Sequence, residues 1–236
     1  MKRYRPPVRP LPGKSSRLPP GPQPVTRDAA PADQRRRILQ AAADLIAEHG
    51  YQATTAEMII RRARVGYGTF YKHFEGKEAC LLDLFDRNIE RSERRLRGVY
   101  ERQEGGWPQK IAAVVASLFE DVRADPEVAR VCLVEAQTVG QAGIERYDAA
   151  IQRFEPFFQP GRQASPHGER LPETLEGTVA SGVLWVVHQQ LRRREPENLT
   201  SLLPETIEFV LRPYVGEEQA VHTADELSGF LTAAPA

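Results

Sequence analysis

Apolar residues recur every three to four positions along most of the chain, which is the spacing of α-helices with one buried face. In DQRRRILQAAADLIAEHG this pattern predicts a first helix with a buried stripe at Ile38, Ala42, Leu45 and Ile46. Asp33 fits the N-cap of this helix, and Gly50 fits its end. No segment alternates with a period of two for long enough to predict a sheet, so we expect an all-α fold.

A second helix is expected in TTAEMIIRRA, with its buried side at Met58, Ile59 and Ala63. Either Thr54 or Thr55 would cap its N-terminus, and Thr54 followed by Glu57 matches a capping box. The turn Arg64-Val65-Gly66 comes next, and a short third helix follows it. Two short helices joined by such a turn predict a helix-turn-helix.

The third helix, in VGYGTFYKHFEGKEACL, has two different faces. At about 100° per residue, Phe70 and Phe74 point in one direction and therefore belong to a core. The residues that point away from them or lie at the border are Tyr67, Gly68, Thr69, Tyr71, Lys72 and His73. This second face has the composition of a contact surface.

The remaining stripes predict a separate helical bundle. A long connecting helix would carry Leu81, Phe85, Ile89, Leu96 and Tyr100. The next stripe has almost ideal helical spacing and comprises Ile111, Val114, Val115, Leu118, Phe119 and Val122. Further helices are expected in EVARVCLVEAQTV, IERYDAAIQRFEPFF, PETLEGTVASGVLWVVHQQLRRR and LLPETIEFVLRPYV.

Composition divides the chain further. Nine of the 19 prolines lie among residues 1–33, mixed with Lys, Arg, Gly and Ser, and this mixture predicts a disordered arm. The arm would either follow a DNA backbone or minor groove, or be a solvated extension without a partner. We expect a three-helix DNA-binding domain over residues 34–80, a helical bundle over 81–216 and a tail over 217–236.

The formal net charge is zero, but the charges are unevenly distributed. Residues 1–103 carry 21 Lys and Arg against 12 Asp and Glu, whereas the remaining residues carry 11 against 20. A basic half that contains a compact helical reader is expected of a nucleic-acid binder, because phosphate attracts it and repels the acidic half. Chance clustering of charges on solvated faces is the alternative interpretation.

The segment GYQATTAEMIIRRARVGYGTFYKHFEGKEACL resembles the DNA-binding segment of the TetR family of bacterial transcriptional regulators. Members of that family typically read G-Y, then T-T, then I-A-x-x-A-G-V-S-x-G-T-[LF]-Y-x-H-F-x-x-K-E-x-L. The positions that match in register are Gly50, Tyr51, Thr55, Ile59, Ala63, Val65, Gly68, Thr69, Phe70, Tyr71, His73, Phe74, Lys77, Glu78 and Leu81. The resemblance implies a regulator that binds DNA, with repression as the default.

Three positions depart from that family pattern. Arg64 stands where the family usually has a glycine, so a residue with a side chain is expected to adopt a left-handed conformation at a cost of about 1 kcal/mol. Gly66 replaces the usual Ser and removes a capping hydroxyl, although glycine is itself a tolerable N-cap. Ile60 replaces a small residue, so the packing of the second helix must be adjusted.

The contact surface can be given a chemical role. Gly68 lets the backbone approach DNA, and the N-terminus of the helix offers unpaired N–H groups to phosphate. Tyr67, Thr69 and Lys72 would reach base edges and sugars, whereas Tyr71, His73 and Lys77 would bind phosphates. The full set of predicted DNA contacts is Thr54, Thr55, Gly66, Tyr67, Gly68, Thr69, Tyr71, Lys72, His73 and Lys77. Packing inside the domain is the alternative for Tyr71 and His73, and a solvated charge is the alternative for Lys77.

The resemblance also implies a homodimer, a small-molecule inducer and a palindromic operator in double-stranded DNA. The last two long helices, residues 172–194 and 202–215, would pair with their copies through a face marked by Gly177, Ser181, Val183 and Val187, unless that face packs within the subunit. A ligand pocket in the bundle would draw on aromatic and polar residues. Its candidates are Trp107, Phe119, Glu135, Tyr147, Phe154, Phe158, Trp185 and His188, and ordinary core packing is the alternative for each.

Other functional classes have less support. There is no GxxxxGK loop, HExxH, GxSxG or paired CxxC, so we expect neither catalysis nor a metal or cofactor. Cys80 and Cys132 lie in apolar helical patterns and should be buried, reduced thiols. No apolar run is long enough to cross a bilayer and no signal peptide is evident, so a cytoplasmic protein is expected. A chromosome-organising protein that uses the same fold is the alternative function.

Overall fold

The computed structural model describes residues 29–233, and within that range the chain forms helices joined by turns and contains no strand. The expected all-α fold is therefore confirmed. The α-helices are α1 (Ala29–His49), α2 (Ala56–Ala63), α3 (Tyr67–His73), α4 (Lys77–Arg102), α5 (Trp107–Ala124), α6 (Pro126–Leu133), α7 (Gln141–Phe154), α8 (Pro160–Ala164), α9 (Leu175–Arg193), α10 (Leu199–Val215) and α11 (Glu217–Ala233). Short 3₁₀ helices are η1 (Glu135–Val139), η2 (Glu155–Phe157), η3 (Gly168–Arg170) and η4 (Pro196–Asn198).

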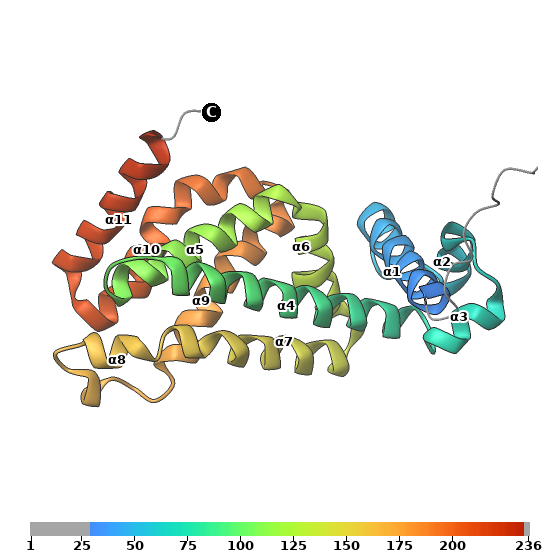
Figure 1. The fold of residues 1–236 in the computed structure, drawn as a ribbon, viewed down its shortest axis with the longest axis horizontal. Helices are drawn as coiled ribbons and strands as arrows, with labels where there is room; N and C mark the ends of the chain where they lie inside the picture. Colours follow the sequence, from blue (N-terminus) through green and yellow to red (C-terminus); the bar gives the residue numbers. More distant parts are fainter. Residues whose placement is uncertain (1–28, 234–236) are drawn as a thin grey trace, which may run out of the picture.

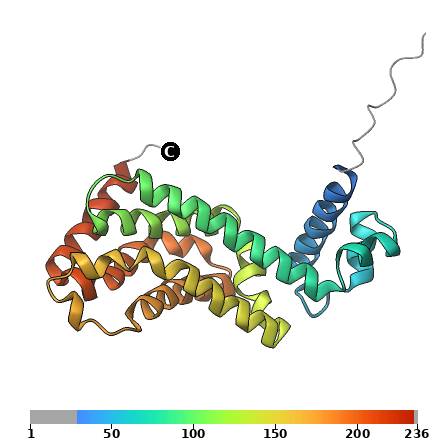
Figure 2. The ribbon, with the colours of Figure 1, turned by 60° about the horizontal axis from the view of Figure 1, so that its bottom comes forward.

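The molecule has a small unit at one end and a larger bundle at the other (Figure 1). Helices α1, α2 and α3 make the small unit, which stands apart from the bundle when the molecule is turned (Figure 2). Helix α4 begins beside α3 and runs into the bundle. The 26 residues of α4 make a rod of about 39 Å, long enough to connect the two units physically.

The small unit has its own apolar core. Ile38 from α1, Ile59 from α2 and Phe70 from α3 are each fully buried, and they belong to one cluster. Burial of each such side chain contributes roughly 1.5 to 3 kcal/mol. The α1, α2 and α3 packing predicted from the apolar stripes is confirmed, including the inward direction of Phe70 and Phe74.

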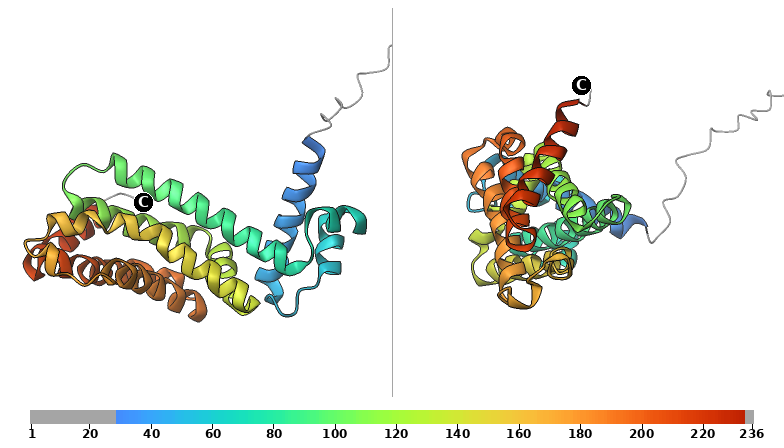
Figure 3. Two further views of the ribbon diagram at one scale, coloured as in Figure 1. Left: turned by 90° about the horizontal axis from the view of Figure 1, so that it is seen from below. Right: turned by 90° about the vertical axis from the view of Figure 1, so that its left-hand side faces the viewer.

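Helix α5 lies at the centre of the bundle, in contact with α4, α9, α10 and α11. Its apolar stripe is buried as predicted, with Ile111 and Phe119 nearly inaccessible. The end view shows the bundle helices gathered around this core (Figure 3). The buried face of α5 therefore forms the centre of the bundle core.

The two units also contact each other through apolar side chains. Ile46 and Tyr51 of the small unit pack with Leu81 of α4 and Val131 of α6. All four side chains are buried. Helix α6 and the small unit therefore share a buried apolar contact.

Two boundaries differ from the sequence prediction. Helix α1 begins at Ala29, so Asp33 lies inside the helix, where its carboxylate accepts a hydrogen bond from Arg36 at 2.5 Å. The earlier start is possible because alanine favours a helix and because Pro31 lies in the first turn, where its missing N–H costs little. The rest of the predicted arm, residues 1–28, lies outside the described residues. The expected helix over EVARVCLVEAQTV is broken at Val134 into α6 and η1.

The predicted tail is also a helix over most of its length. Gly216 takes a φ of +83°, which redirects the chain, and α11 starts at Glu217. Ala220 and Ala224 are buried against the bundle at the end farthest from α3. Small residues at this spacing make a narrow apolar stripe, too weak a signal to separate from a polar tail in the sequence.

Candidate nucleic-acid interface

Helix α2 begins at the second of the two threonines. Thr55 is the N-cap, and its Oγ1 accepts from the Met58 N–H at 3.2 Å. Thr54 is fully buried, and its hydroxyl donates to the carbonyls of Leu45 (3.2 Å) and Gly50 (2.9 Å). The predicted Thr54 capping box and the assignment of Thr54 to the DNA surface are therefore wrong, because Thr54 fastens the loop to α1.

The turn between α2 and α3 has the geometry expected from its unusual residues. Arg64 adopts the left-handed conformation, with φ 53° and ψ 49°, and its N–H closes the C-terminus of α2. Gly66 is the N-cap of α3 and forms no side-chain cap. The N-terminal N–H groups of α3 therefore lack a capping hydroxyl and remain available to an external acceptor.

The outer face of α3 is open. Tyr67 is 57% exposed and Tyr71 is 55% exposed, and Lys72 is exposed as well, whereas Thr69 is half-buried. A Cβ placed on Gly68 would meet no atom within 4 Å. Within the described part of the chain the side chains of Tyr67, Thr69 and Lys72 have no hydrogen bond or ion pair, so all three are free to bind an outside partner.

Lys77 and His73, two predicted phosphate ligands, differ in their surroundings. Lys77 donates to the carbonyls of Tyr51 (2.9 Å) and Gln52 (3.2 Å), and its Nζ lies 4.3 Å from the centre of the Tyr51 ring. Burial, reinforced by Glu78, raises the pKa of Tyr51, so its ring remains a neutral partner for the lysine. His73 is half-buried beside Phe74, and its Nε2 is a buried atom without a hydrogen-bond partner in residues 31–226. Lys77 thus fastens the loop after α1 to α4, whereas the phosphate role of His73 stays a prediction.

Arginines flank α3 on the small unit. Arg62 forms two hydrogen bonds with Glu48 of α1, at 2.9 and 2.7 Å, which join α1 and α2, and this contact is the main cause that lowers the pKa of Glu48. Arg61 is exposed, with a long contact of 3.8 Å to Glu57. Arg64 is exposed beside the N-terminus of α3. The sequence prediction omitted Arg64 from the surface, although the run Arg61-Arg62-Ala63-Arg64 signalled it.

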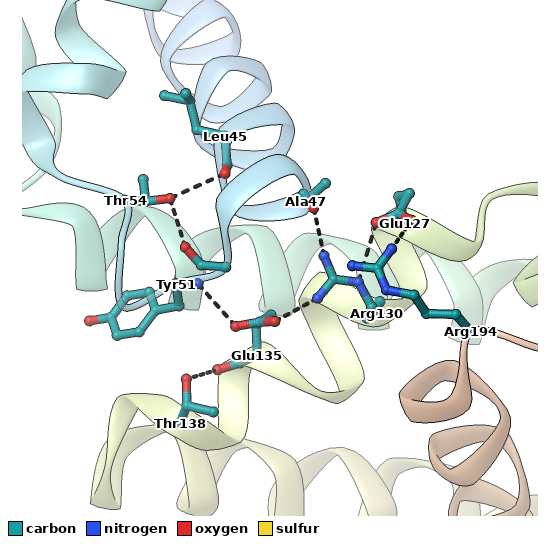
Figure 4. A network of polar contacts seen from close by, with 10 residues as sticks. Leu45, Ala47, Tyr51, Thr54, Glu127, Arg130, Glu135, Thr138 and Arg194 are labelled. Carbon is teal, nitrogen blue, oxygen red and sulfur yellow. Dashed lines mark hydrogen bonds and ion pairs between the residues drawn. The ribbon is translucent and has the colours of Figure 1, made fainter.

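A polar network connects the bundle to the corner between α1 and α2 (Figure 4). Glu135 accepts from the Tyr51 N–H at 3.0 Å and from Arg130 Nη1 at 2.6 Å. Arg130 also donates to the Ala47 carbonyl at 2.7 Å, at the end of α1. We call Ala47, Tyr51, Arg130 and Glu135 the domain bridge. Glu135 was predicted in the ligand pocket, and that prediction is wrong because its carboxylate is engaged here.

The bridge is well shielded from water. Arg130 is 8% exposed, and its Nε lies 3.2 Å from Glu127, which also faces Arg194 at the end of α9 at 3.5 Å. A buried guanidinium is tolerable only when its donors are satisfied, and here three acceptors satisfy it. Helix α9 is thereby joined to the same network (Figure 4).

Two cavities lie along α4 and α6. The inner cavity, of about 250 Å³, is enclosed by α4, α5, α6, α7 and α9, and the outer cavity, of about 600 Å³, lies between α1, α4 and α6. Phe154, a predicted pocket residue, lines the inner cavity. The other seven candidates are not among the residues that line these two cavities.

Most of those seven candidates have structural roles instead. Phe119 and Phe158 are buried in the bundle core, and Tyr147 packs at its edge. Trp107 is also buried, and its indole N–H donates to the Phe157 carbonyl at 3.0 Å. Burial, together with Arg192, lowers the pKa of half-buried His188 on α9, so this residue is neutral at physiological pH. Aromatic content alone did not distinguish a pocket from a core.

The exposed face of α9 and α10 differs from the predicted one. Val183 and Val187 are buried in the bundle core, and a Cβ on Gly177 would lie 2.9 Å from Glu155 of the same subunit, so these three residues do not form a free dimer surface. Trp185 of α9 is 62% exposed and Phe209 of α10 is 47% exposed. Trp185 was predicted to line the ligand pocket, and that prediction is wrong because its side chain is exposed on the outside of the bundle.

Gly182 brings the two outward-facing helices close together. A Cβ there would lie 2.7 Å from the Phe209 ring, so only glycine lets that ring lie across α9. Ser181 is half-buried beside it. Trp185, Phe209 and Gly182 together form an apolar strip on the outside of the bundle, which we call the α9–α10 strip.

Two further observations concern residues 29–233. None of the helices there combines the length and apolar character that a membrane crossing requires. His, Cys, Asp and Glu side chains do not come together there in any group of three or more suited to a metal ion. Cys80 and Cys132 are buried free thiols, as predicted.

Comparison with known proteins gives a consistent result. Residues 38–84 match the family model described as "Bacterial regulatory proteins, tetR family". The chain is 31% identical over 103 residues to the "Fatty acid metabolism regulator protein" of Bacillus subtilis, covering 42% of this chain and 50% of that protein. It is 30% identical over 92 residues to the uncharacterized HTH-type transcriptional regulator YerO of Bacillus subtilis, covering 39% of this chain and 32% of that protein. The chain thus spans half or less of the length of these relatives.

The fold itself is shared over a longer range. The solved transcriptional regulator FadR from Bacillus subtilis, in complex with stearoyl-CoA, superposes with a TM-score of 0.65 at 22% identity. That match covers 75% of this chain and 98% of the other. At this identity the likeness establishes the arrangement of the helices.

Proposed function

We propose that this chain, whose residues 38–84 match the TetR family model, is a ligand-responsive, sequence-specific DNA-binding repressor that acts as a homodimer. The observation that carries the proposal is the outer face of α3. It is exposed, polar and unpaired, and the domain that presents it is bridged to a bundle containing a cavity. A ligand-responsive regulator requires a DNA-recognition helix, a ligand cavity and a physical connection between them.

Helix α3 would enter the major groove with its N-terminus toward the phosphate backbone. Tyr67, Thr69 and Lys72 would reach base edges, and Tyr71 would contact a phosphate. Thr55, Gly66 and Gly68 lie where the backbone approaches DNA, and the open space at Gly68 supports a close approach. Arg64 adds a positive charge at the same end of α3.

Dimerisation would use the α9–α10 strip. Trp185 and Phe209 are exposed aromatic rings on neighbouring helices, and aromatic side chains are enriched at the centres of interfaces. A two-fold axis there would place two copies of α3 on one face, so that they read half-sites of a palindromic operator one helical turn apart.

A small molecule in the bundle would release the DNA. Its binding would favour one position of α6, and the domain bridge would communicate that position to the corner between α1 and α2. Typical couplings of this kind are about 1 to 3 kcal/mol, which weaken DNA binding by roughly five- to 150-fold.

The proposal is tested by selection of bound sequences from a random duplex library, followed by affinity measurements on the selected operator. Tyr67→Ala should cost about 1 to 3 kcal/mol on the operator and leave non-specific binding unchanged. Ile144→Ala, at an exposed apolar residue of α7, is the matched control. A library that yields no preferred palindrome would refute sequence-specific regulation, and mapping of many dispersed genomic sites would favour chromosome organisation instead.

A further inference from the structure

The outer cavity between α1, α4 and α6 is strongly basic. Four arginines line it, namely Arg35, Arg36, Arg87 and Arg91, and its one acidic lining residue is Asp125. Asp125 is occupied as the N-cap of α6, where its Oδ1 accepts from Val128 at 3.2 Å. A cavity with this charge is suited to an anion.

The outer cavity adjoins the inner one. The residues that line both are Asn88, Arg91, Asp125, Val128 and Cys132. Most other residues around the inner cavity are apolar, namely Ile89, Leu118, Val122, Ala129, Leu133, Phe154 and Leu184. Its remaining charges, Arg95 and Asp121, neutralise each other in an ion pair. An apolar cavity and a basic cavity therefore lie side by side and together make one candidate binding space.

Arg91 lies where the two cavities meet. It is exposed, and within residues 31–226 its guanidinium has neither an ion pair nor a hydrogen bond. Arg35 and Arg87 both bind the same carboxylate, that of Asp83, at 2.7 and 2.8 Å. Two guanidinium groups on one carboxylate leave an uncompensated positive charge beside Arg91.

We infer that the space binds an amphiphile with an apolar tail in the inner cavity and an anionic carboxylate or phosphate headgroup at Arg91, Arg35 and Arg87. This inference rests on the proposed function, since it names the class of the effector. Tail burial supplies affinity that does not depend on charge, and the guanidinium groups select the headgroup.

The headgroup would act on the DNA-binding domain directly. Arg35 belongs to α1, and its guanidinium lies 4.9 Å from the centre of the ring of Phe74, the C-cap of α3. An anion in the outer cavity competes with Asp83 for Arg35 and thereby shifts α1 against α4. The same molecule therefore contacts the bundle with its apolar tail and the small unit, which carries α3, with its headgroup.

The experiment is calorimetric titration of the full chain, without DNA, with four probes below their micelle concentrations: dodecanoate, dodecyl phosphate, dodecanol and dodecylammonium. The anions should bind. The alcohol and the cation should bind at least about tenfold more weakly, which is the effect of losing one charge-assisted hydrogen bond. Comparison of the two anions distinguishes a carboxylate from a phosphate headgroup.

Three variants locate the binding. Arg91→Gln should weaken binding of the anions about tenfold and leave binding of dodecanol unchanged, whereas Leu118→Trp should fill the inner cavity and abolish binding of all probes. Arg94→Gln is the matched control, because Arg94 lies on the same helix, outside both cavities, with only a 3.9 Å contact to Glu90. Melting of each variant without probe checks folding, and Ala129→Phe replaces Leu118→Trp if the latter is unstable.

Equal affinity for anion and alcohol, unchanged anion binding in Arg91→Gln, or no binding of either anion would overturn the inference. The regulator proposal would survive each of these results if another compound weakened operator binding. Conversely, anion binding by a protein that selects no operator would support the cavity assignment and refute the regulator.

Discussion

Replacement of Glu135 is the sharpest test of how the bundle communicates with the DNA-binding domain. Glu135→Gln keeps the size of the side chain and one acceptor oxygen, but it removes the negative charge that faces Arg130 at 2.6 Å. Glu135→Ala also removes the acceptor for the Tyr51 N–H, now 3.0 Å away. The two variants therefore separate the charge from the hydrogen-bond acceptor.

The magnitudes follow from what each variant leaves unpaired. A hydrogen bond to a charged group contributes about 1.5 to 3 kcal/mol, so Glu135→Gln should cost about 2 kcal/mol. Loss of the partner of the Tyr51 N–H adds about 1 kcal/mol, which gives about 3 kcal/mol for Glu135→Ala. This value lies at the low end of the roughly 3 to 5 kcal/mol for an orphaned buried charge, because Glu127 and the Ala47 carbonyl still face Arg130.

Two measurements check these values. Thermal unfolding should shift by about 2 to 4 °C per kcal/mol for a chain of this size, hence by about 4 to 8 °C for Glu135→Gln. Amide exchange of the peptide containing Tyr51 should accelerate, more in Glu135→Ala than in Glu135→Gln. Glu90→Gln is the control, because Glu90 lies on the surface of α4, 3.9 Å from Arg94, and such pairs contribute under about 1 kcal/mol.

The functional consequence is a loss of coupling. The Glu135 variants should still bind operator and effector separately, whereas the effector should change operator affinity less than it does in the unmodified protein. A Glu135→Gln protein that melts with the control, keeps slow exchange at Tyr51 and retains full coupling would show that the domain bridge transmits nothing.

Four further outcomes are expected. Gly68→Ala should leave the fold intact or stabilise it by about 0.5 to 1 kcal/mol, since no atom opposes its Cβ, and calorimetry with operator titration should show that only DNA binding suffers. Lys72→Ala should weaken operator binding by about 1 to 3 kcal/mol, as expected for a base contact, whereas Lys77→Ala should instead lower the melting temperature because its Nζ caps two carbonyls. Trp185→Glu should yield a folded monomer in sedimentation, and an unchanged dimer would exclude the α9–α10 strip. Burial raises the pKa of the Cys132 thiol to about 12, so its alkylation at pH 8 should be far slower in the native than in the unfolded protein, and equal rates would contradict that burial.

The sequence predicted those features of the reader that depend on local spacing. Phe70 and Phe74 are buried and Tyr67 is exposed because helical periodicity alone assigns them to opposite faces. The left-handed Arg64 followed from the resemblance, because the TetR family usually has a glycine at that position. Each of these inferences uses residues within one or two turns of each other.

The errors concern contacts between residues far apart in the chain. Thr54 and Thr55 are equivalent as caps, and what distinguishes them is the fit of Thr54 against α1, which no local pattern records. Glu135 binds Tyr51, a residue 84 positions away. Val183 and Val187 belong to a helix that is apolar on several sides, so periodicity cannot say which side faces its own core and which faces a second subunit.

The loop between α1 and α2 is held from three directions, and this determines what an effector can change. The Thr54 hydroxyl fixes it to α1, Lys77 fixes it to α4, and Glu135 fixes it to the bundle. A loop held in this way moves as a body with α1, so a shift of α6 displaces the whole reader domain and leaves the shape of α3 unchanged. Hydrogen bonds to bases fail once donor and acceptor separate beyond about 3.5 Å, and two half-sites lie about 34 to 36 Å apart on DNA. A displacement of a few ångströms in each subunit of the proposed dimer therefore suffices to break both sets of base contacts, because the recognition helices lose their spacing while keeping their structure.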